Sequence, residues 1–256
     1  MSTGTDRPTP EAAPAAVSIV DLSVRFGDTD VLRGVSARFV RGEIAVVLGS
    51  SGSGKTTLLK HILGLLRPQH GCVEVLGYDL ADATESELAA VRRRMGVLFQ
   101  QGALLNSATV FENVRMPLEQ HADLPASVID RVVRTKLALV GLESAEGALP
   151  SELSGGMRKR AALARALALD PELLLCDEPS SGLDPVTARS LDQLLRDLQR
   201  RLGMTMIVVS HDMAGVRRTA DRVFFIQQGV IAFTGTVDEA DACDVDEVHD
   251  FLTAAV

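Results

Sequence analysis

The sequence predicts an α/β fold: a parallel sheet with flanking helices, a small antiparallel β subdomain and an inserted α-helical subdomain. Short apolar runs, several of them β-branched, recur along the chain at the length of buried strands. Polar residues follow three of these runs directly, as at the carboxyl ends of strands in an open parallel sheet. Hydrophobic residues make up 46% of the 256 residues, so the chain can bury a substantial core.

Composition narrows the function before any motif is considered. The formal net charge is −8 and no long basic run occurs, so nucleic acid is not expected as a partner. No apolar run reaches the ~18 residues that span a bilayer, and the N-terminus lacks a signal-peptide pattern, so we expect a cytosolic chain. Cys72, Cys176 and Cys243 lie far apart, which predicts reduced cysteines and no metal site among them. Cys176 is expected to be a small buried hydrophobe.

The N-terminal part is expected to form the antiparallel subdomain. Residues 1–16 are rich in Pro, Ala and Thr and are predicted to be disordered, with structure beginning near Val17. Val17–Val20, Val35–Val40 and Cys72–Leu76 have the composition of strands separated by polar turns. We expect them to form a small sheet beside the core.

The middle of the chain changes character. Glu85–Arg94 has a helical pattern, and Met95–Phe99 returns as a strand. From about residue 102 to 170 helical patterns dominate, with Ser127 as the predicted cap of a helix that runs to about Val140. This stretch is interpreted as the inserted helical subdomain.

The C-terminal part returns to the sheet. Leu173–Cys176 and Met206–Val209 are apolar enough for central parallel strands that are covered on both faces. Val223–Ile226 and Val230–Phe233, joined by the turn at Gln228-Gly229, predict a hairpin.

A glycine-rich loop lies between the apolar run Ile44–Leu48 and a helical pattern that begins at Thr57. The loop consists of Gly49, Ser50, Ser51, Gly52, Ser53, Gly54, Lys55, Thr56 and Thr57. Its glycines let successive backbone N–H groups surround phosphate oxygens, and the helix start adds its positive dipole end. Lys55 is expected to reach the β- and γ-phosphates, and the Thr56 hydroxyl to bind Mg²⁺. The loop predicts nucleotide binding; the alternative is a glycine-rich turn.

Other polar residues follow the remaining core strands. Asp177 is the candidate Mg²⁺ ligand beside Thr56, and Glu178 is the candidate general base for the attacking water. His211 is expected to contact the γ-phosphate or to orient that water. Because the carboxyl ends of parallel strands share one edge, these side chains should converge on one nucleotide. The alternatives are an acidic turn and a solvated or core histidine.

A second stretch with anion-binding chemistry begins at Leu153. It comprises Ser154, Gly155, Gly156 and Met157, followed by a run of strong helix formers. Backbone N–H groups, a serine hydroxyl and a helix start together form another anion site. Since the chain already has one, we expect this site to serve the nucleotide of another copy; the alternative is an ordinary serine cap.

These motifs, in this order, resemble those of the nucleotide-binding subunit of an ABC transporter. The resemblance covers residues 17–256 and implies a P-loop NTPase core of the ABC type. The Walker A loop, Q-loop, signature, Walker B, D-loop and switch histidine correspond to Gly49–Thr57, Gln100, Leu153–Met157, Leu174–Glu178, Ser181–Asp184 and His211. The resemblance implies a head-to-tail homodimer that closes around two ATP molecules with Mg²⁺ and hydrolyses them. It also implies that Gln100 contacts the metal and the reacting water, and that Asp184 acts in the D-loop.

Phe26 stands where that family usually has an aromatic residue that stacks on adenine. The alternative for Phe26 is ordinary packing near a turn.

Details of sequence resemble one branch, the ATPases of Mce- or Mla-type lipid transporters, which are MlaF-like. The signature has Met157 where Gln is usual. Three stretches are similar in sequence to members of that branch: Ser154–Arg160, Gly96–Leu105 and Pro117–His121. The resemblance implies transport of phospholipid, sterol or a related lipid, with a MlaE/YrbE-like permease and, indirectly, MCE-domain proteins. The subunit would then lie peripherally on the cytoplasmic side of the inner membrane.

Three other functions are weighed against this one. An ABC importer or exporter of another small molecule is the main alternative. A mechanoenzyme of DNA or translation usually has two ATPase heads or a coiled-coil insertion, and neither is present. A P-loop kinase does not explain Leu153–Met157 or His211. For a transporter, the permease helix is expected near Gly102–Asn113, where Ala103–Leu105 forms either a docking groove or ordinary core.

Overall fold

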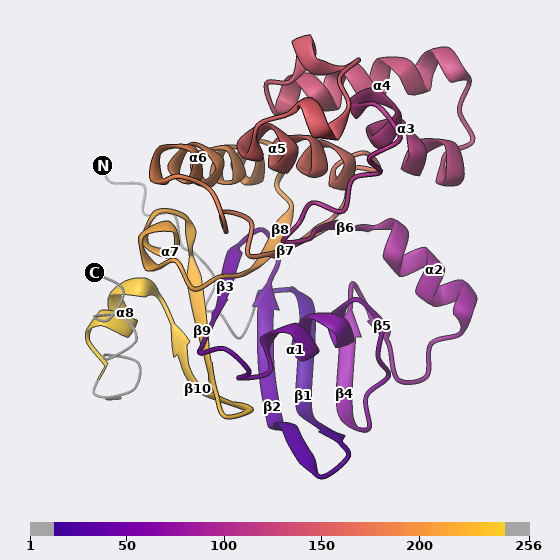
Figure 1. Ribbon diagram of the computed structural model, residues 1–256. Coiled ribbons are helices and arrows are strands. Elements are labelled where there is room, and N and C mark those ends of the chain that lie inside the picture. The colour runs from indigo at the N-terminus through magenta and orange to yellow at the C-terminus, as the bar shows by residue number, and fades with distance from the viewer. Residues whose placement is uncertain (1–12, 244–256) are drawn as a thin grey trace, which may run out of the picture.

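The computed structural model describes residues 13–243 and has two sheets and a helical layer (Figure 1). The larger sheet has the strand order β10-β9-β3-β8-β7-β6. Its strands are β3 (Ile44–Leu48), β6 (Met95–Leu98), β7 (Leu173–Asp177), β8 (Thr205–Val209), β9 (Arg222–Gln227) and β10 (Val230–Gly235). Neighbouring strands from β9 to β6 are parallel, and β10 pairs with β9 in an antiparallel hairpin. Every residue of β8 and the first four residues of β7 are buried, which confirms the two predicted central strands, and β3 is buried throughout as well.

The smaller sheet is antiparallel, with the order β2-β1-β4-β5, as predicted. Its strands are β1 (Ala15–Phe26), β2 (Thr29–Val40), β4 (His70–Val75) and β5 (Tyr78–Asp79). The two sheets share a core in which the Phe39 and Phe224 rings lie 4.5 Å apart between centroids. This contact fixes the small sheet beside β9.

The start of the structure corrects the sequence prediction. β1 begins at Ala15, and Ala16 is buried in the core between the sheets, so residues 15 and 16 are not disordered. Small alanines were interpreted as part of a proline- and alanine-rich lead-in, but burial against the sheet outweighs their weak strand propensity. Residues 1–12 of the predicted disordered segment lie outside the described residues.

The helical layer after β6 contains α3 (Val110–His121), α4 (Ala126–Leu139) and α5 (Gly155–Ala166), with short 3-10 turns at Glu143–Ala145 and Pro150–Glu152. The predicted cap at Ser127 is wrong. Pro125 occupies the N-cap position, and the amide of Val128 already donates to the Pro125 carbonyl. Proline suits a helix start because its fixed φ is preorganised and its missing N–H is not needed there.

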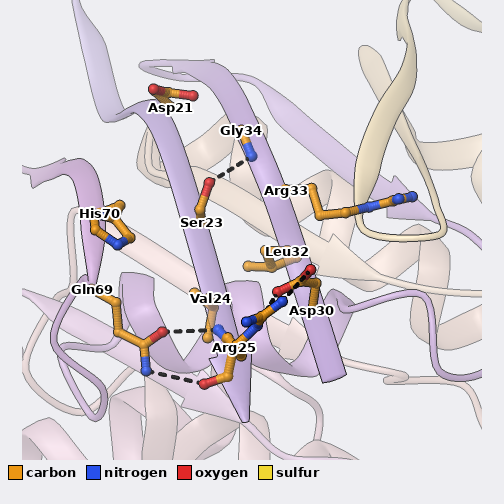
Figure 2. A pocket seen from close by; sticks show the side chains of 10 residues that line it. All are labelled: Asp21, Ser23, Val24, Arg25, Asp30, Leu32, Arg33, Gly34, Gln69 and His70. Atoms are coloured by element: carbon orange, nitrogen blue, oxygen red, sulfur yellow. Dashed lines mark hydrogen bonds and ion pairs between the residues drawn. The ribbon is translucent and has the colours of Figure 1, made fainter. Parts of the chain in front are cut away.

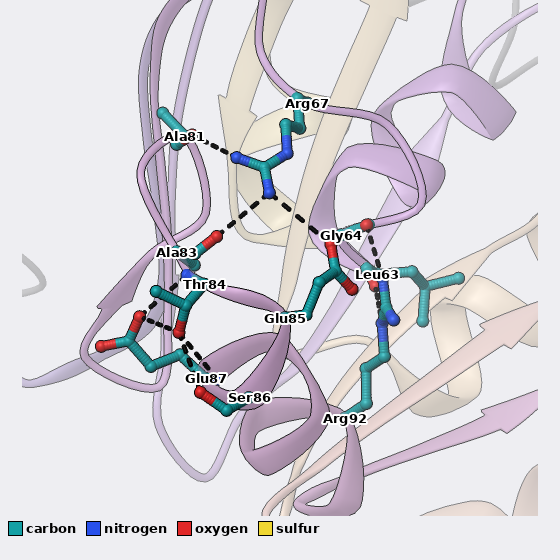
Figure 3. A network of polar contacts seen from close by, with 10 residues as sticks. All are labelled: Leu63, Gly64, Arg67, Ala81, Ala83, Thr84, Glu85, Ser86, Glu87 and Arg92. Carbon is teal, nitrogen blue, oxygen red and sulfur yellow. Dashed lines mark hydrogen bonds and ion pairs between the residues drawn. The ribbon is translucent and has the colours of Figure 1, made fainter.

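The remaining helices are α1 (Lys55–Ile62), α2 (Glu85–Arg93), α6 (Pro185–Leu202), α7 (Met213–Thr219) and α8 (Val237–Asp241). Figure 3 shows how α2 holds the end of α1. Arg92 donates to the carbonyls of Leu63 and Gly64, and Arg67 donates to those of Ala81 and Ala83. The Arg92 bonds satisfy carbonyls at the end of α1, whose beginning carries the glycine-rich loop, and the Arg67 bonds hold the segment that leads into α2. No helix in the described residues is long and apolar enough to cross a membrane.

Candidate active site

The glycine-rich loop joins β3 to α1, as predicted, and its backbone admits no side chain at two positions. Gly49 has φ 149° and Gly54 has φ 108°. A Cβ at Gly49 would lie 2.1 Å from the Ile226 carbonyl oxygen, and one at Gly54 would lie 2.6 Å from Leu32. Glycine alone fits both positions, so the loop can pass close to Ile226 of β9 and Leu32 of β2.

Two polar groups in this loop fit a phosphate. The Lys55 ammonium lies inside it and donates to the carbonyl oxygens of Gly49 and Ser50, at 2.8 Å each. Burial lowers the pKa of Lys55, and the nearby carboxylates of Glu178 and Asp177 oppose that shift. The buried Ser53 hydroxyl has no hydrogen-bond partner. A buried polar group normally has one, so an anion with several acceptor oxygens suits this loop.

The predicted convergence at the strand ends is present. The Gln100 amide, just after β6, donates to Glu178 Oε2 at 2.9 Å. The His211 Nδ1, just after β8, lies 3.1 Å from Glu178 Oε1. Glu178 follows β7 with φ 46°, a left-handed conformation that is uncommon outside glycine. Three residues from three loops thus meet at one carboxylate.

Asp177, the last residue of β7, is half-buried beside this carboxylate. Burial raises the pKa of Asp177, the Glu178 charge adds to the rise, and Lys55 and Lys159 oppose it. Thr56, next to Lys55 at the start of α1, is exposed. Across residues 13–243, no three His, Cys, Asp or Glu side chains gather to hold a metal. Oxygen donors at Asp177 and Thr56 suit Mg²⁺, which is commonly held by one or two protein groups together with phosphates.

A cavity of about 360 Å³ opens beside Glu178 and His211 and extends along the start of α6. Asp184 lies there as the N-cap of α6, where its carboxylate accepts from the amides of Val186 and Thr187 at 3.0 and 3.1 Å. These bonds hold the pKa of Asp184 below its ordinary value, with Thr187 as the main cause. The predicted D-loop residue is therefore exposed and ionised next to the cavity.

The second anion site stands apart from the first. Ser154 is exposed and caps α5, where its hydroxyl accepts from the Met157 amide at 3.3 Å. Gly155 and Gly156 form the first turn, and a Cβ at Gly156 would lie 2.4 Å from the Thr187 methyl group. α5 belongs to the helical layer, whereas α1 lies next to the antiparallel sheet (Figure 1). The two helices that begin with the predicted anion sites thus belong to different layers of the chain.

Phe26 and Lys159 differ in their exposure and in whether the sequence points to them. Phe26 ends β1 with 49% of its surface exposed, so its ring is available for stacking. Lys159 was not singled out from the sequence. Its ammonium donates to the carbonyl oxygens of Gln100 and Glu178. Its spacing from the buried Ala162 and Leu163 on α5 is the signal that it faces inward.

A separate groove of about 530 Å³ lies on the antiparallel sheet (Figure 2). None of the predicted site residues lines it. Gln69 exchanges hydrogen bonds with the Arg25 backbone, and the Arg25 side chain pairs with Asp30. Several polar groups of this groove thus bind one another, and the predicted site residues with catalytic chemistry lie at the larger sheet.

Comparisons with known proteins agree with this geometry. A family profile described as ABC transporter matches residues 32–181. The intermembrane phospholipid transport system ATP-binding protein MlaF of Escherichia coli K12 is 42% identical over 236 residues, 92% of this chain and 88% of that protein. The probable ribonucleotide transport ATP-binding protein mkl of Mycobacterium tuberculosis H37Rv is 40% identical over 96% of this chain and 69% of its own length.

Solved structures give the same result. The dimeric post-hydrolysis state of the ATP-binding cassette MJ0796 with ADP and Pi matches with a TM-score of 0.78 and 30% identity, covering 86% of this chain and 98% of that one. The cbiO1 protein of Clostridium perfringens, part of the ABC transporter complex cbiONQ, matches with a TM-score of 0.81 and 27% identity, covering 92% and 98%. These matches confirm the predicted α/β fold. The chain therefore belongs to the ABC transporter family, in which it is an ATP-binding subunit that hydrolyses ATP.

Proposed function

We propose that this chain powers phospholipid transport through a membrane permease, and that the Glu178 carboxylate is the base of its ATPase reaction. The observation that carries the catalytic part is the meeting of Gln100, Glu178 and His211 beside the glycine-rich loop. Glu178 accepts the proton of the attacking water, and His211 and Gln100 orient the carboxylate and that water. Lys55 leaves its two loop carbonyls and binds the β- and γ-phosphates.

Magnesium is the cofactor that these residues fit. Thr56, Asp177 and Gln100 are the proposed ligands, with Asp177 acting through water. When bound, the ion offsets negative charge on the β- and γ-phosphate oxygens. Burial and the Glu178 charge raise the pKa of Asp177, and the positive charges of Lys55 and Lys159 oppose this rise.

The site is complete only with a second copy. The start of α5 carries the stretch from Ser154 to Met157, in which Ser154 is exposed and the other three residues are half-buried. In a head-to-tail homodimer they reach the γ-phosphate that the partner copy holds, and Asp184 lies between the two sites. The dimeric MJ0796 cassette, which holds ADP and Pi, supports this arrangement.

The permease binds at a groove beneath the helical subdomain. This groove of about 530 Å³ lies between α2, β6, α3 and α5, and its lining includes Met95, Val97, Met116 and Leu169. Arg92, Arg93 and Arg165 also line it, so an amphipathic helix with acidic residues at its ends fits. The groove lies next to the segment 102–113, where the sequence predicts docking, and does not include it.

Phospholipid is the proposed substrate class because MlaF proteins match over about nine-tenths of this chain. A MlaE/YrbE-like permease selects the lipid, MCE-domain proteins carry it onward, and this subunit lies peripherally on the cytoplasmic side of the inner membrane. The name of the mkl protein points to ribonucleotides instead. Substrate selection belongs to the permease, so the test must include it.

The test is capture of the Glu178→Gln chain from its native membranes with ATP, followed by identification of the bound permease. We expect a MlaE-like permease, and we expect the reconstituted wild-type complex to move labelled phospholipid between vesicles only with ATP. Lys55→Ala is the matched control that should not move lipid. A permease of another class, or ATP-dependent movement of ribonucleotide without phospholipid, contradicts the proposed substrate.

A further inference from the structure

Lys159 is a buried cation that none of the predicted roles uses. It lies on α5, five residues after Ser154, and only 6% of its surface is exposed. Its ammonium donates to the carbonyl oxygen of Gln100 and to that of Glu178, the latter at 3.3 Å. Burial lowers the pKa of Lys159, while the Cys176 thiol and the Glu178 and Asp177 carboxylates raise it. A buried ammonium needs such acceptors, and it takes them from the backbone of the catalytic residues.

Both acceptors lie at points where the backbone is held in place. Glu178 has φ 46°, and its amide donates to the Val209 carbonyl at 2.9 Å. Its carbonyl accepts from the Ser181 amide at 3.2 Å and from Lys159. A non-glycine residue keeps a left-handed conformation only where its surroundings impose it. Lys159 is one of the groups that impose it.

The segment that carries Gln100 is tied to α5 at a second point. The Arg165 guanidinium, on a half-buried residue, donates to the carbonyls of Gly102 and Ala103 at 3.0 and 2.7 Å. Two cations of one helix thus bind three carbonyls of the residues 100–103. The helix that begins with the signature is therefore fastened to the Q-loop of its own chain.

We propose that Lys159 is a positioning residue that fixes the carbonyls of Gln100 and Glu178 so that the Gln100 amide and the Glu178 carboxylate meet at 2.9 Å. This role rests on the proposed function of Glu178 as the base, and it connects α5 to the Glu178 carboxylate. Ser154, at the start of α5, serves the partner's nucleotide, whereas Lys159 acts on the nucleotide of its own chain. A shift of α5 when the partner's ATP binds is transmitted through Lys159 to the catalytic carboxylate.

The first test separates turnover from binding. Lys159→Met keeps the length and apolar stem of the side chain and removes its donors. We expect kcat to fall by ~10²-fold, because small displacements of a reacting group cost about this much, while KM and the Kd for ATP stay within about twofold. Lys159→Arg, which retains donors, should recover part of kcat. Wild-type kcat in Lys159→Met overturns the proposal, as does an equal change in Kd.

The matched control is Lys136→Met. Lys136 is the other lysine of the helical subdomain that is buried, at 5% exposure, and its ammonium pairs with the Asp170 carboxylate, whereas Lys159 binds the carbonyls of Gln100 and Glu178. Both variants should lower the thermal midpoint, but only Lys159→Met should lower kcat. Equal losses of kcat would make Lys159 an ordinary structural residue and contradict the proposal.

Mixed dimers determine which nucleotide Lys159 serves. When Lys159→Met and Ser154→Ala chains are combined, one site of the heterodimer keeps an intact Glu178 region and an intact partner serine. We expect activity to return to the level of the reference mixture of Glu178→Gln and Ser154→Ala. If the reference mixture is active and the mixture with Lys159→Met is not, Lys159 acts on the partner's ATP through the signature of its own chain, and the proposal is wrong. A wild-type chain without ATPase activity would instead contradict the proposed function.

Discussion

The two anion sites of this chain use the same ingredients and are built differently. Each places serine and glycine at the start of a helix, α1 in one case and α5 in the other. The glycine-rich loop is a closed site in which the Lys55 ammonium binds the loop's own carbonyls. The signature stretch is exposed, and its Ser154 caps its own helix. The first site is self-contained, and the second faces outward.

Similar sequence chemistry can therefore serve opposite purposes. The carbonyls of the glycine-rich loop already bind the Lys55 ammonium, so ATP must replace two of the bonds that Lys55 makes. The signature stretch offers N–H groups of a helix start to a ligand that approaches α5. Variants at the two sites should therefore fail in different ways.

Glu178→Gln removes the base and should lower ATP turnover by ~10³-fold, within the usual range for general base catalysis. ATP binding should persist, because the glycine-rich loop is unchanged. The variant should accumulate as an ATP-bound dimer in which the two anion sites face each other, visible by size-exclusion chromatography with ATP. Rapid turnover by this variant would remove Glu178 from its proposed role.

Ser154→Ala should lower kcat by ~10²-fold, the usual cost of losing one donor to developing charge. The ATP affinity of the isolated chain should not change, because Ser154 faces another copy. Ser154→Asp retains a helix cap but repels phosphate, so it should lose activity without losing thermal stability. The exposed Ser151 provides the matched alanine control. A loss of affinity in the isolated chain would argue against a split site.

Lys55→Ala should weaken ATP binding by ~10–10²-fold, since a hydrogen bond to a charged group contributes about 1.5–3 kcal/mol. Here the defect appears in the isolated chain, unlike that of Ser154→Ala. Lys60→Ala, on the exposed face of the same helix, is the control. Titration calorimetry that finds unchanged affinity would contradict the assignment of this loop.

Phe26→Ala should have the smallest effect, about tenfold weaker ATP binding, because stacking of a base on an aromatic ring contributes about 1–3 kcal/mol. Binding of inorganic tripolyphosphate, which has no base, should not change. Phe26→Tyr should restore ATP affinity. Equal effects on ATP and tripolyphosphate would show that Phe26 only packs.

Much of the fold could be predicted because its core strands are uniformly apolar. β3, β7 and β8 are short, buried runs followed directly by polar residues, and this pattern located the site. β1 and β2 extend further than predicted, since their outer halves alternate exposed and buried residues around turns. The cap at Ser127 was misplaced because proline competes for the same position.

Lys159 is hard to recognise from the sequence, because it lies between Arg158 and Arg160 in a run that resembles a solvated helix face. Its spacing from Ala162 and Leu163 is a weak signal, and the packing of α5 against β6 separates the buried lysine from its neighbours. His211 is different: it follows its own strand, so the topology predicts that it lies near Glu178. Gln100 was expected there from the family resemblance. Strand ends can be predicted from sequence more readily than inward-facing charges on helices.

The engagement of both Glu178 oxygens bears on how a water molecule can approach the carboxylate. Oε2 accepts from Gln100, and Oε1 lies 3.1 Å from His211 Nδ1, so each oxygen already has one neighbour. A carboxylate oxygen has two lone pairs, so a water molecule can bind there without displacing either neighbour. Such a water molecule lies within reach of both side chains, and this restricts its orientation.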